Sequence, residues 1–252
     1  MIGVFDSGVG GLTVLRALRE TLPSADVLYF GDTKNAPYGA KRRAELAELS
    51  VRGLQLLHER GARRIISACN SVSVSLAVSL FDTFSVAPTE LIEMVGPTVS
   101  YFRGAKVRVV LAATEATVES EIYQSGFRMI GRDIEVVTIP ELASAIERGA
   151  RISEVEGVIG EAFAHASFSE GDVLVLACTH YPLALPSFRK VLGDNVLIFD
   201  PAYAVAARAE KLFWPQESGS GETQFVLSKE SDVFRNAARE IIGSEPNIEV
   251  VE

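Results

Sequence analysis

The two cysteines of the chain stand in matched sequence contexts. Residues 64–71 read RIISACNS and residues 173–180 read VLVLACTH, so each cysteine follows a short apolar run and an alanine. A thiolate can act as a nucleophile or as a base, and a histidine, whose side chain can accept and donate protons, follows two residues after the second cysteine. A single cysteine after a buried strand is more often a structural core residue, so the repetition of the pattern is what indicates function.

Each apolar run has the length and composition of a strand that is buried on both faces, as at the centre of a parallel sheet. Cys69 and Cys178 would then lie at the carboxyl ends of two strands. Ligands bind at that edge of an open α/β sheet, because the following helix presents unpaired N–H groups and its positive dipole end. The sequence therefore places both thiols at candidate ligand-binding edges.

A disulfide and a metal site are the weaker interpretations of the two cysteines. The first residues read MIGVF and do not resemble a secretory leader, so we expect a cytoplasmic protein with reduced thiols. No further Cys or His stands at zinc-site spacing beside either cysteine. We therefore expect neither a metal nor a cofactor.

Length and charge limit the class of protein. A chain of 252 residues with 48% hydrophobic content can form one large α/β domain or two domains of about a hundred residues each. The net charge is −9 and the largest basic cluster is residues 41–43, so we expect no nucleic-acid partner. No apolar run is long enough to span a membrane. An anionic small molecule remains compatible with this charge, because helix N-termini and backbone amides can hold carboxylates.

Strand and helix patterns alternate along the first part of the chain and predict a doubly wound parallel sheet. A glycine-rich turn at 6–11 follows the first strand, and a polar loop at 31–39 follows the second. The expected strands are 2–5, 26–30 and 64–68, and the expected helices begin at 12, 41 and 71, the last ending near 80.

A second alternating series begins after a candidate hinge at 96–97. Its expected strands are 107–112, 134–138, 173–177 and 196–199, and its expected helices are one from 118, 141–147 and 203–213. A strand at 225–228 and a helix at 230–242 are expected to return to the first half. The pattern predicts an α/β fold with two doubly wound domains, residues 1–93 plus 204–252 and residues 94–203, which face each other across a ligand cleft.

Four motifs resemble those of glutamate racemases in the aspartate/glutamate racemase family. They are FDSGVGGLT at 5–13, APYG at 36–39, ACNS at 68–71 and ACTHYP at 177–182, and the resemblance covers essentially the whole chain. It implies two pseudo-symmetric domains and cofactor-independent interconversion of L- and D-glutamate for bacterial peptidoglycan synthesis. The oligomeric state stays open, with a homodimer as one option.

The resemblance also implies roles for individual residues. Cys69 and Cys178 match the two catalytic cysteines, Asp6 matches a carboxylate near the first, and His180 and Glu147 match groups near the second. Asp6 and His180 are expected to contact the substrate too. The other positions that match substrate-binding residues are Ser7, Tyr38, Gly39, Asn70, Ser71, Thr117 and Thr179.

Three positions depart from the family pattern. Ser71 stands where threonine is usual, Val72 replaces a small alanine, and Glu93 falls where a glycine usually ends the strand before the hinge. A carboxylate at position 93 could repel a glutamate side chain near the cleft, but a lone glutamate more often faces solvent.

Two opposed cysteines suit racemisation, because one base must remove the α-proton on one face while an acid supplies a proton on the other. Alternatives remain open. A cysteine hydrolase could use Cys178 and His180, although residues two apart on a turn need not face each other and Cys69 would have no role. A non-catalytic amino-acid-binding regulator could keep the cleft without the chemistry. Aspartate racemase is the nearest enzyme alternative, separated only by the size of the pocket.

Overall fold

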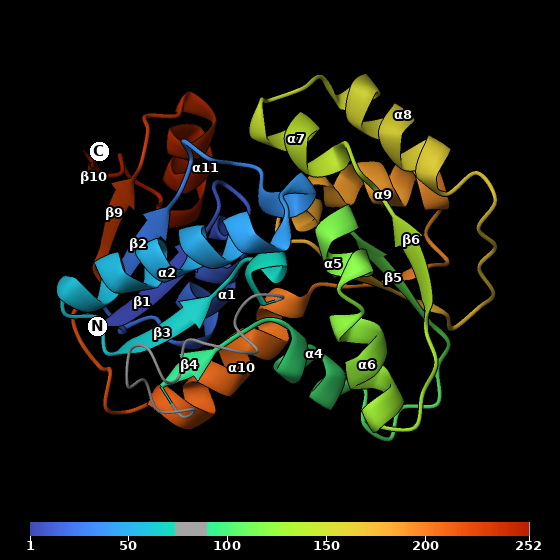
Figure 1. Ribbon diagram of the computed structural model, residues 1–252, viewed down its shortest axis with the longest axis horizontal. Helices are drawn as coiled ribbons and strands as arrows, with labels where there is room; N and C mark the ends of the chain where they lie inside the picture. Colours follow the sequence, from blue (N-terminus) through green and yellow to red (C-terminus); the bar gives the residue numbers. More distant parts are fainter. Residues whose placement is uncertain (74–89, 252) are drawn as a thin grey trace.

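The computed structural model describes residues 1–73 and 90–251, and it contains two parallel-sheet α/β domains (Figure 1). The first sheet has six strands in the order β10-β9-β2-β1-β3-β4, and the second has four in the order β6-β5-β7-β8. The strands of the first sheet are β1 (Ile2–Asp6), β2 (Val27–Gly31), β3 (Arg64–Ser67), β4 (Leu91–Ile92), β9 (Thr223–Leu227) and β10 (Ile248–Val250). Those of the second are β5 (Val109–Ala113), β6 (Glu135–Thr138), β7 (Val173–Ala177) and β8 (Leu197–Phe199).

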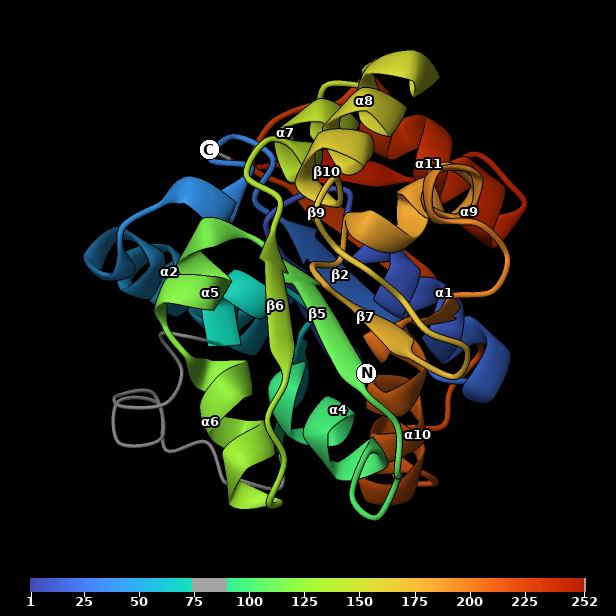
Figure 2. The same cartoon turned by 90° about the vertical axis from the view of Figure 1, so that its right-hand side faces the viewer.

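Helices cover both faces of each sheet, as the buried central strands require. On the first sheet one core forms against α1 (Leu12–Thr21), α10 (Pro201–Phe213) and α11 (Asp232–Ile242), and the other forms against α2 (Arg43–Glu59). On the second sheet the two cores form against α7 (Leu142–Glu147), α8 (Ile152–Ala162) and α9 (Leu185–Leu192), and against α4 (Val95–Tyr101) and α6 (Ile122–Met129). Figure 2 shows the second sheet in front of the first.

The winding of each sheet reverses at its centre. β1 lies between β2 and β3, and β5 lies between β6 and β7, with every one of these pairs parallel. The switch point of each sheet therefore lies between its first and third strands in chain order. Cys69 follows β3 and Cys178 follows β7, so the two cysteines occupy equivalent places at the two switch points.

Most of the expected elements are present, with ends shifted by one or two residues. The helix expected from 71 begins at 70, and its predicted continuation to 80 lies outside the described residues beyond 73. The helix expected from 118 is wrong in outline, because α5 (Glu115–Glu119) and α6 are separated at Glu121, whose φ is 52°. α4, α8, α9 and β10 were not predicted from the sequence.

The expected hinge residues, 96–97, lie inside helix α4, which packs against both α6 and α10. The C-terminal segment returns to the first sheet, where β9 pairs with β2. The predicted limit at 93/94 falls between β4 and α4, and the limit at 203/204 falls inside α10. Both domain limits stay predictions. In the described part of the chain, no helix combines the length and apolar content needed to cross a bilayer.

Candidate active site

A small cavity between the two sheets is lined by residues of both domains. Its volume is about 10 Å³, room for roughly one water molecule, so the cleft is closed in this structure. Both cysteines line it, and neither forms a disulfide. The other lining residues are Ser7, Pro37, Tyr38, Gly39, Asn70, Ser71, Thr114, Ala143, Thr179 and His180.

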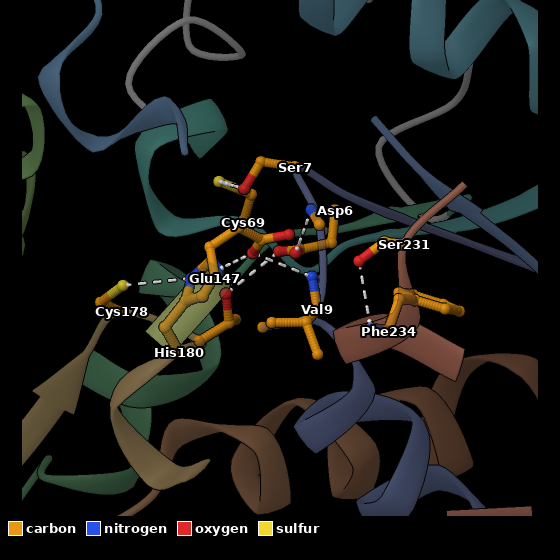
Figure 3. A network of polar contacts seen from close by, with 12 residues as sticks. Asp6, Ser7, Val9, Cys69, Glu147, Cys178, His180, Ser231 and Phe234 are labelled. Atoms are coloured by element: carbon orange, nitrogen blue, oxygen red, sulfur yellow. Dashed lines mark hydrogen bonds and ion pairs between the residues drawn. The ribbon is translucent and has the colours of Figure 1, made fainter. Parts of the chain in front are cut away.

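His180 connects the second cysteine to a carboxylate (Figure 3). Its Nδ1 lies 3.8 Å from the sulfur of Cys178, and its Nε2 lies 2.5 Å from Oε2 of Glu147. Burial alone would lower the pKa of His180, but the hydrogen bonds to Cys178 and Glu147 outweigh it and hold that pKa well above its ordinary value. The imidazole is therefore protonated near neutral pH, with one N–H directed at the sulfur and the other at Glu147.

Cys69 has different neighbours. Its sulfur lies 3.9 Å from the hydroxyl of Ser7, and the side chain is 5% exposed. Burial raises the pKa of the Cys69 thiol, and the nearby charge of Asp6 raises it further. In the closed site Cys69 therefore carries its proton.

Asp6, at the end of β1, is fully buried and joins the two domains. Its Oδ1 accepts a hydrogen bond from the N–H of Gly8 at 2.9 Å, and its Oδ2 accepts one from the hydroxyl of Thr179 at 3.0 Å. Burial raises the pKa of the Asp6 carboxyl, although the positive charge of His180 opposes the shift. The carboxyl therefore holds a proton more readily than an exposed aspartate does.

The glycine-rich turn after β1 touches the second domain directly. A Cβ at Gly10 would lie 2.6 Å from the hydroxyl oxygen of Thr179 and 2.7 Å from Nδ1 of His180, and a Cβ at Gly8 would overlap the Glu147 carboxylate. The N–H of Val9 donates to Oε2 of Glu147 at 3.2 Å. Glycine is required here because the turn approaches the histidine–glutamate pair more closely than any side chain permits.

Hydroxyl and amide groups from both domains complete the lining. The hydroxyl of Ser71 lies 3.3 Å from that of Thr114, which lies 3.2 Å from that of Thr117. Asn70 is 2% exposed, and its Nδ2 has no hydrogen-bond partner among the described residues. These groups supply donors that could hold a carboxylate or stabilise negative charge on a bound molecule.

The loop that carries Tyr38 and Gly39 is held by a residue that the sequence analysis missed. Asp32, 5% exposed and just beyond β2, accepts hydrogen bonds from the Tyr38 hydroxyl at 2.5 Å and from the Ser228 hydroxyl at 2.6 Å. Burial raises the pKa of Tyr38, and the charge of Asp32 raises it further, so the phenol stays protonated. A Cβ at Gly39 would lie 2.7 Å from Thr114, so this turn also presses on the opposite domain.

The departures at positions 72 and 93 do not line the cavity. Glu93 accepts hydrogen bonds from the N–H groups of Val95 and Gly96, both at 2.6 Å, and so satisfies the first turn of α4. Glu93 does not simply face solvent, because it is half-buried and its carboxylate accepts from two backbone donors, and the repulsion of a bound glutamate stays a prediction. Val72 is fully buried in the core beneath α2.

The structure thus brings the expected site residues together at one place. Three of them lie behind the lining and each contacts a lining residue: Asp6 contacts Thr179, Glu147 contacts His180, and Thr117 contacts Thr114. Besides Asp32, the sequence analysis missed Thr114 and Tyr123, the latter a partner of Asn70. Thr114 follows β5 directly, and this position at a strand end was the signal that could have identified it. Within the described ranges, no group of three or more His, Cys, Asp or Glu side chains is arranged to hold a metal ion.

The fold and the cavity together define a two-domain α/β enzyme with a candidate active site in the cleft between the domains. The chain belongs to the Asp/Glu/Hydantoin racemase family, whose model matches residues 3–209. A glutamate racemase of Thermoanaerobacter pseudethanolicus is 34% identical over 251 residues, which cover 96% of this chain and 93% of that protein. One of Desulforudis audaxviator is 36% identical over 259 residues, with coverages of 97% and 94%.

Solved structures agree. Glutamate racemase from Francisella tularensis in complex with D-glutamate aligns with a TM-score of 0.84 at 29% identity, covering 100% of this chain and 97% of that one. The enzyme from Thermus thermophilus in complex with β-chloro-D-alanine aligns with a TM-score of 0.79 at 31% identity, with coverages of 100% and 96%.

Proposed function

We propose that this protein is a glutamate racemase that uses Cys69 and Cys178 as opposed acid and base. One observation carries the proposal: the two thiols, from equivalent strand ends of two different domains, line the same cavity. The resemblance to glutamate racemases over nearly the whole chain supports glutamate as the substrate.

The neighbours of the two cysteines suggest how a turnover begins. Cys69 is held as a thiol, while the sulfur of Cys178 faces an imidazolium. In this state Cys178 is the base that removes the α-proton of L-glutamate, and Cys69 is the acid that delivers a proton to the opposite face. The reverse reaction starts from the opposite protonation state. Because His180 carries both of its ring protons in this state, Cys178 can pass on the proton that it gains only after the imidazolium has lost one, and the Glu147 carboxylate beside Nε2 is the acceptor within reach.

The α-proton of an amino acid is far less acidic than a thiol, so the site must stabilise the carbanionic charge. The unpartnered Nδ2 of Asn70 and the hydroxyls of Ser7 and Ser71 are the donors available for the substrate carboxylates and for this charge, whereas the Thr179 hydroxyl already donates to Asp6. Such donors are worth most in a cavity that excludes water, which fits the closed cleft.

The test is racemisation and α-proton exchange of each glutamate enantiomer in D₂O, followed by NMR and polarimetry, after exhaustive chelation and without added pyridoxal phosphate. We expect both enantiomers to exchange and to reach a racemic mixture, with a clear preference for glutamate over aspartate. Activity that returns only with added metal or cofactor would refute the cofactor-independent mechanism. Equal specificity constants for the two acids would refute glutamate as the preferred substrate.

The contact between Cys178 and His180 also fits a second candidate, a cysteine hydrolase, and the two side chains face each other although they are only two residues apart. Such an enzyme would need Cys178 and would be indifferent to Cys69. A binding-only regulator would need neither thiol. If racemisation is observed, we further propose a cytoplasmic role in supplying D-glutamate for peptidoglycan synthesis.

A further inference from the structure

Tyr123 makes a contact across the cleft that the proposed chemistry has not used. The residue lies in α6 of the second domain and its side chain is fully buried. Its hydroxyl donates a hydrogen bond of 2.6 Å to Oδ1 of Asn70, which follows Cys69 in the first domain. The bond thus joins the covering helix of one domain to the residue beside the thiol of the other.

This bond determines which end of the Asn70 amide faces the cavity. An asparagine amide has an accepting oxygen and a donating nitrogen at almost equal positions, and only its surroundings decide between them. With Oδ1 held by Tyr123, the donating Nδ2 is the end left without a partner in the described structure, on a residue that lines the cavity. The reversed amide would present an oxygen, which repels a carboxylate or a carbanion.

We propose that Tyr123 is a positioning residue of the racemase, which fixes the Asn70 amide so that Nδ2 donates to a carboxylate of the bound amino acid. This inference rests on the proposed function. Tyr123 does not line the cavity, so it acts only through Asn70. Burial raises the pKa of the Tyr123 phenol, and the charge of Glu93 raises it further, so the hydroxyl keeps its proton and remains a donor over the working range of pH.

Tyr123→Phe removes the hydroxyl and keeps the ring that fills the core. Without its anchor the amide samples both orientations, so half or more of the enzyme lacks the donor. We expect KM for glutamate to rise by up to about tenfold while kcat changes much less, because a bond to a carboxylate is present in the ground state and in the transition state alike.

The decisive measurement is a double-mutant cycle with Asn70→Ala. If Tyr123 acts through Asn70, Tyr123→Phe lowers kcat/KM in the wild-type background and has no further effect in the Asn70→Ala background. A purely structural role for the tyrosine would give the same loss in both backgrounds.

Tyr181→Phe is the matched control. Tyr181 is also fully buried, and its hydroxyl donates to a backbone carbonyl, that of Ile139, at 2.9 Å. Both variants lose one buried hydrogen bond, so thermal denaturation should show similar losses of stability. Any effect of Tyr181→Phe on kcat/KM should persist undiminished when Asn70→Ala is added.

A spectroscopic readout makes the test independent of turnover. The side-chain ¹⁵N–¹H pair of Asn70, identified by its absence in Asn70→Ala, should shift in Tyr123→Phe and stay in place in Tyr181→Phe. Additive losses of kcat/KM, or an unmoved amide signal, would overturn the positioning role and leave the racemase proposal intact. Wild-type protein that neither racemises nor exchanges glutamate would overturn the proposed function, and this inference with it.

Discussion

Cys69 and Cys178 occupy equivalent positions in two similar domains, yet their immediate neighbours differ. Cys69 contacts a serine hydroxyl and lies near the Asp6 carboxyl, whereas Cys178 contacts a histidine. The charge environments of the two thiols therefore differ, although β2-β1-β3-β4 and β6-β5-β7-β8 follow the same strand order. This asymmetry is the basis for the different roles that we propose for the two thiols.

Replacing each cysteine with serine tests the opposed-thiol mechanism at the level of single residues. We expect Cys69→Ser and Cys178→Ser each to abolish racemisation, because a serine hydroxyl is too weak an acid to replace a thiol. Each variant keeps one competent thiol, so it can still exchange the α-proton of the enantiomer that this thiol faces. The measurement is deuterium incorporation into L- and D-glutamate, with circular dichroism to confirm folding.

The proposed roles of the two cysteines pair L-glutamate with Cys178 and D-glutamate with Cys69. Cys69→Ser should therefore retain exchange with L-glutamate, and Cys178→Ser should retain it with D-glutamate. Racemisation near the wild-type rate in Cys69→Ser would return Cys69 to the status of a buried structural residue and favour a mechanism with Cys178 alone.

The buried Asp6 makes stability depend on pH in an unusual direction. Because burial raises its pKa above the ordinary 3.8, the folded protein binds the proton more tightly than the unfolded chain. The wild type therefore loses stability as pH rises from about 4 through the folded pKa. Asp6→Asn stays neutral, so the Tm of this variant relative to the Tm of the wild type should rise as pH increases over this range. Its racemisation should fall. Thermal denaturation between pH 4 and about 8 measures the difference.

Asp172→Asn is a control for which we expect the opposite pH dependence of stability relative to the wild type. The N–H of Ser169 and the guanidinium of Arg108 lower the pKa of the Asp172 carboxyl, so its contribution to stability is present above its unfolded pKa and is lost as pH falls. This variant should therefore be least stable, relative to the wild type, at neutral pH. Parallel pH profiles for the two variants would contradict the raised pKa of Asp6.

Sequence reasoning found the side chains that project from strand ends and missed those that act through tertiary contacts. Cys69, Cys178 and Asp6 follow apolar strand patterns, so their edge positions could be predicted. Tyr123 and Asp32 lie away from a recognised motif, and their roles depend on which residue the fold brings opposite to them. The surroundings of Glu93 could not be predicted for the same reason. Its carboxylate accepts hydrogen bonds from backbone N–H groups that are placed beside it only when α4 forms.

Helix α4 begins with the carboxylate of Glu93 bound to two backbone N–H groups. We expect Glu93→Ala to lower the free energy of unfolding by about 1 kcal/mol, since it leaves helix N–H groups without an acceptor. KM and kcat should change little, because the carboxylate does not line the cavity. Chemical denaturation and steady-state kinetics measure the two effects.

Glu115→Ala is the matched control for this helix end. Glu115 is an exposed acidic residue in the first turn of α5 and makes no capping hydrogen bond there. Its removal should cost well under half as much stability as Glu93→Ala. A large rise in KM for Glu93→Ala would show instead that this carboxylate influences substrate binding.

The central strands were easier to predict than the ends of helices and the short elements near the C-terminus. The central strands β1, β5 and β7 are continuous apolar runs because helices cover both of their faces. β10 has only three residues and is largely exposed at the sheet edge, so its sequence carries little pattern. The hinge expected at 96–97 followed from a glycine and a proline that in fact fit the first turn of α4, where a proline is tolerated.

Contacts across the cleft keep the whole molecule closed around a very small cavity. Thr179 donates to Asp6, Val9 donates to Glu147, and Tyr123 donates to Asn70. A cavity of about 10 Å³ cannot hold an amino acid, so we expect the cleft to open before substrate enters.

The two cysteines report on this opening, because the chain contains no others. In the native protein we expect a thiol reagent such as DTNB to label Cys69 and Cys178 more slowly than in urea by at least on the order of a hundredfold, since labelling requires the open state. Glutamate should slow labelling further. The single serine variants assign a rate to each thiol. Labelling as fast as in the unfolded chain, with no effect of glutamate, would show that the cleft is open in solution.

The glycine turn at 8–11 also determines how far this closure can go. On the first-domain side of this contact only the peptide main chain meets the second domain. Because the main chain has no side chain that could change rotamer, the turn sets a fixed minimum distance between the two domains. A single methyl group at Gly10 would meet Thr179 and His180 and keep the two domains further apart. The backbone of the turn therefore limits the distance between the two thiols that is available to a substrate. Adding the smallest side chain, a methyl group, would be enough to change that distance.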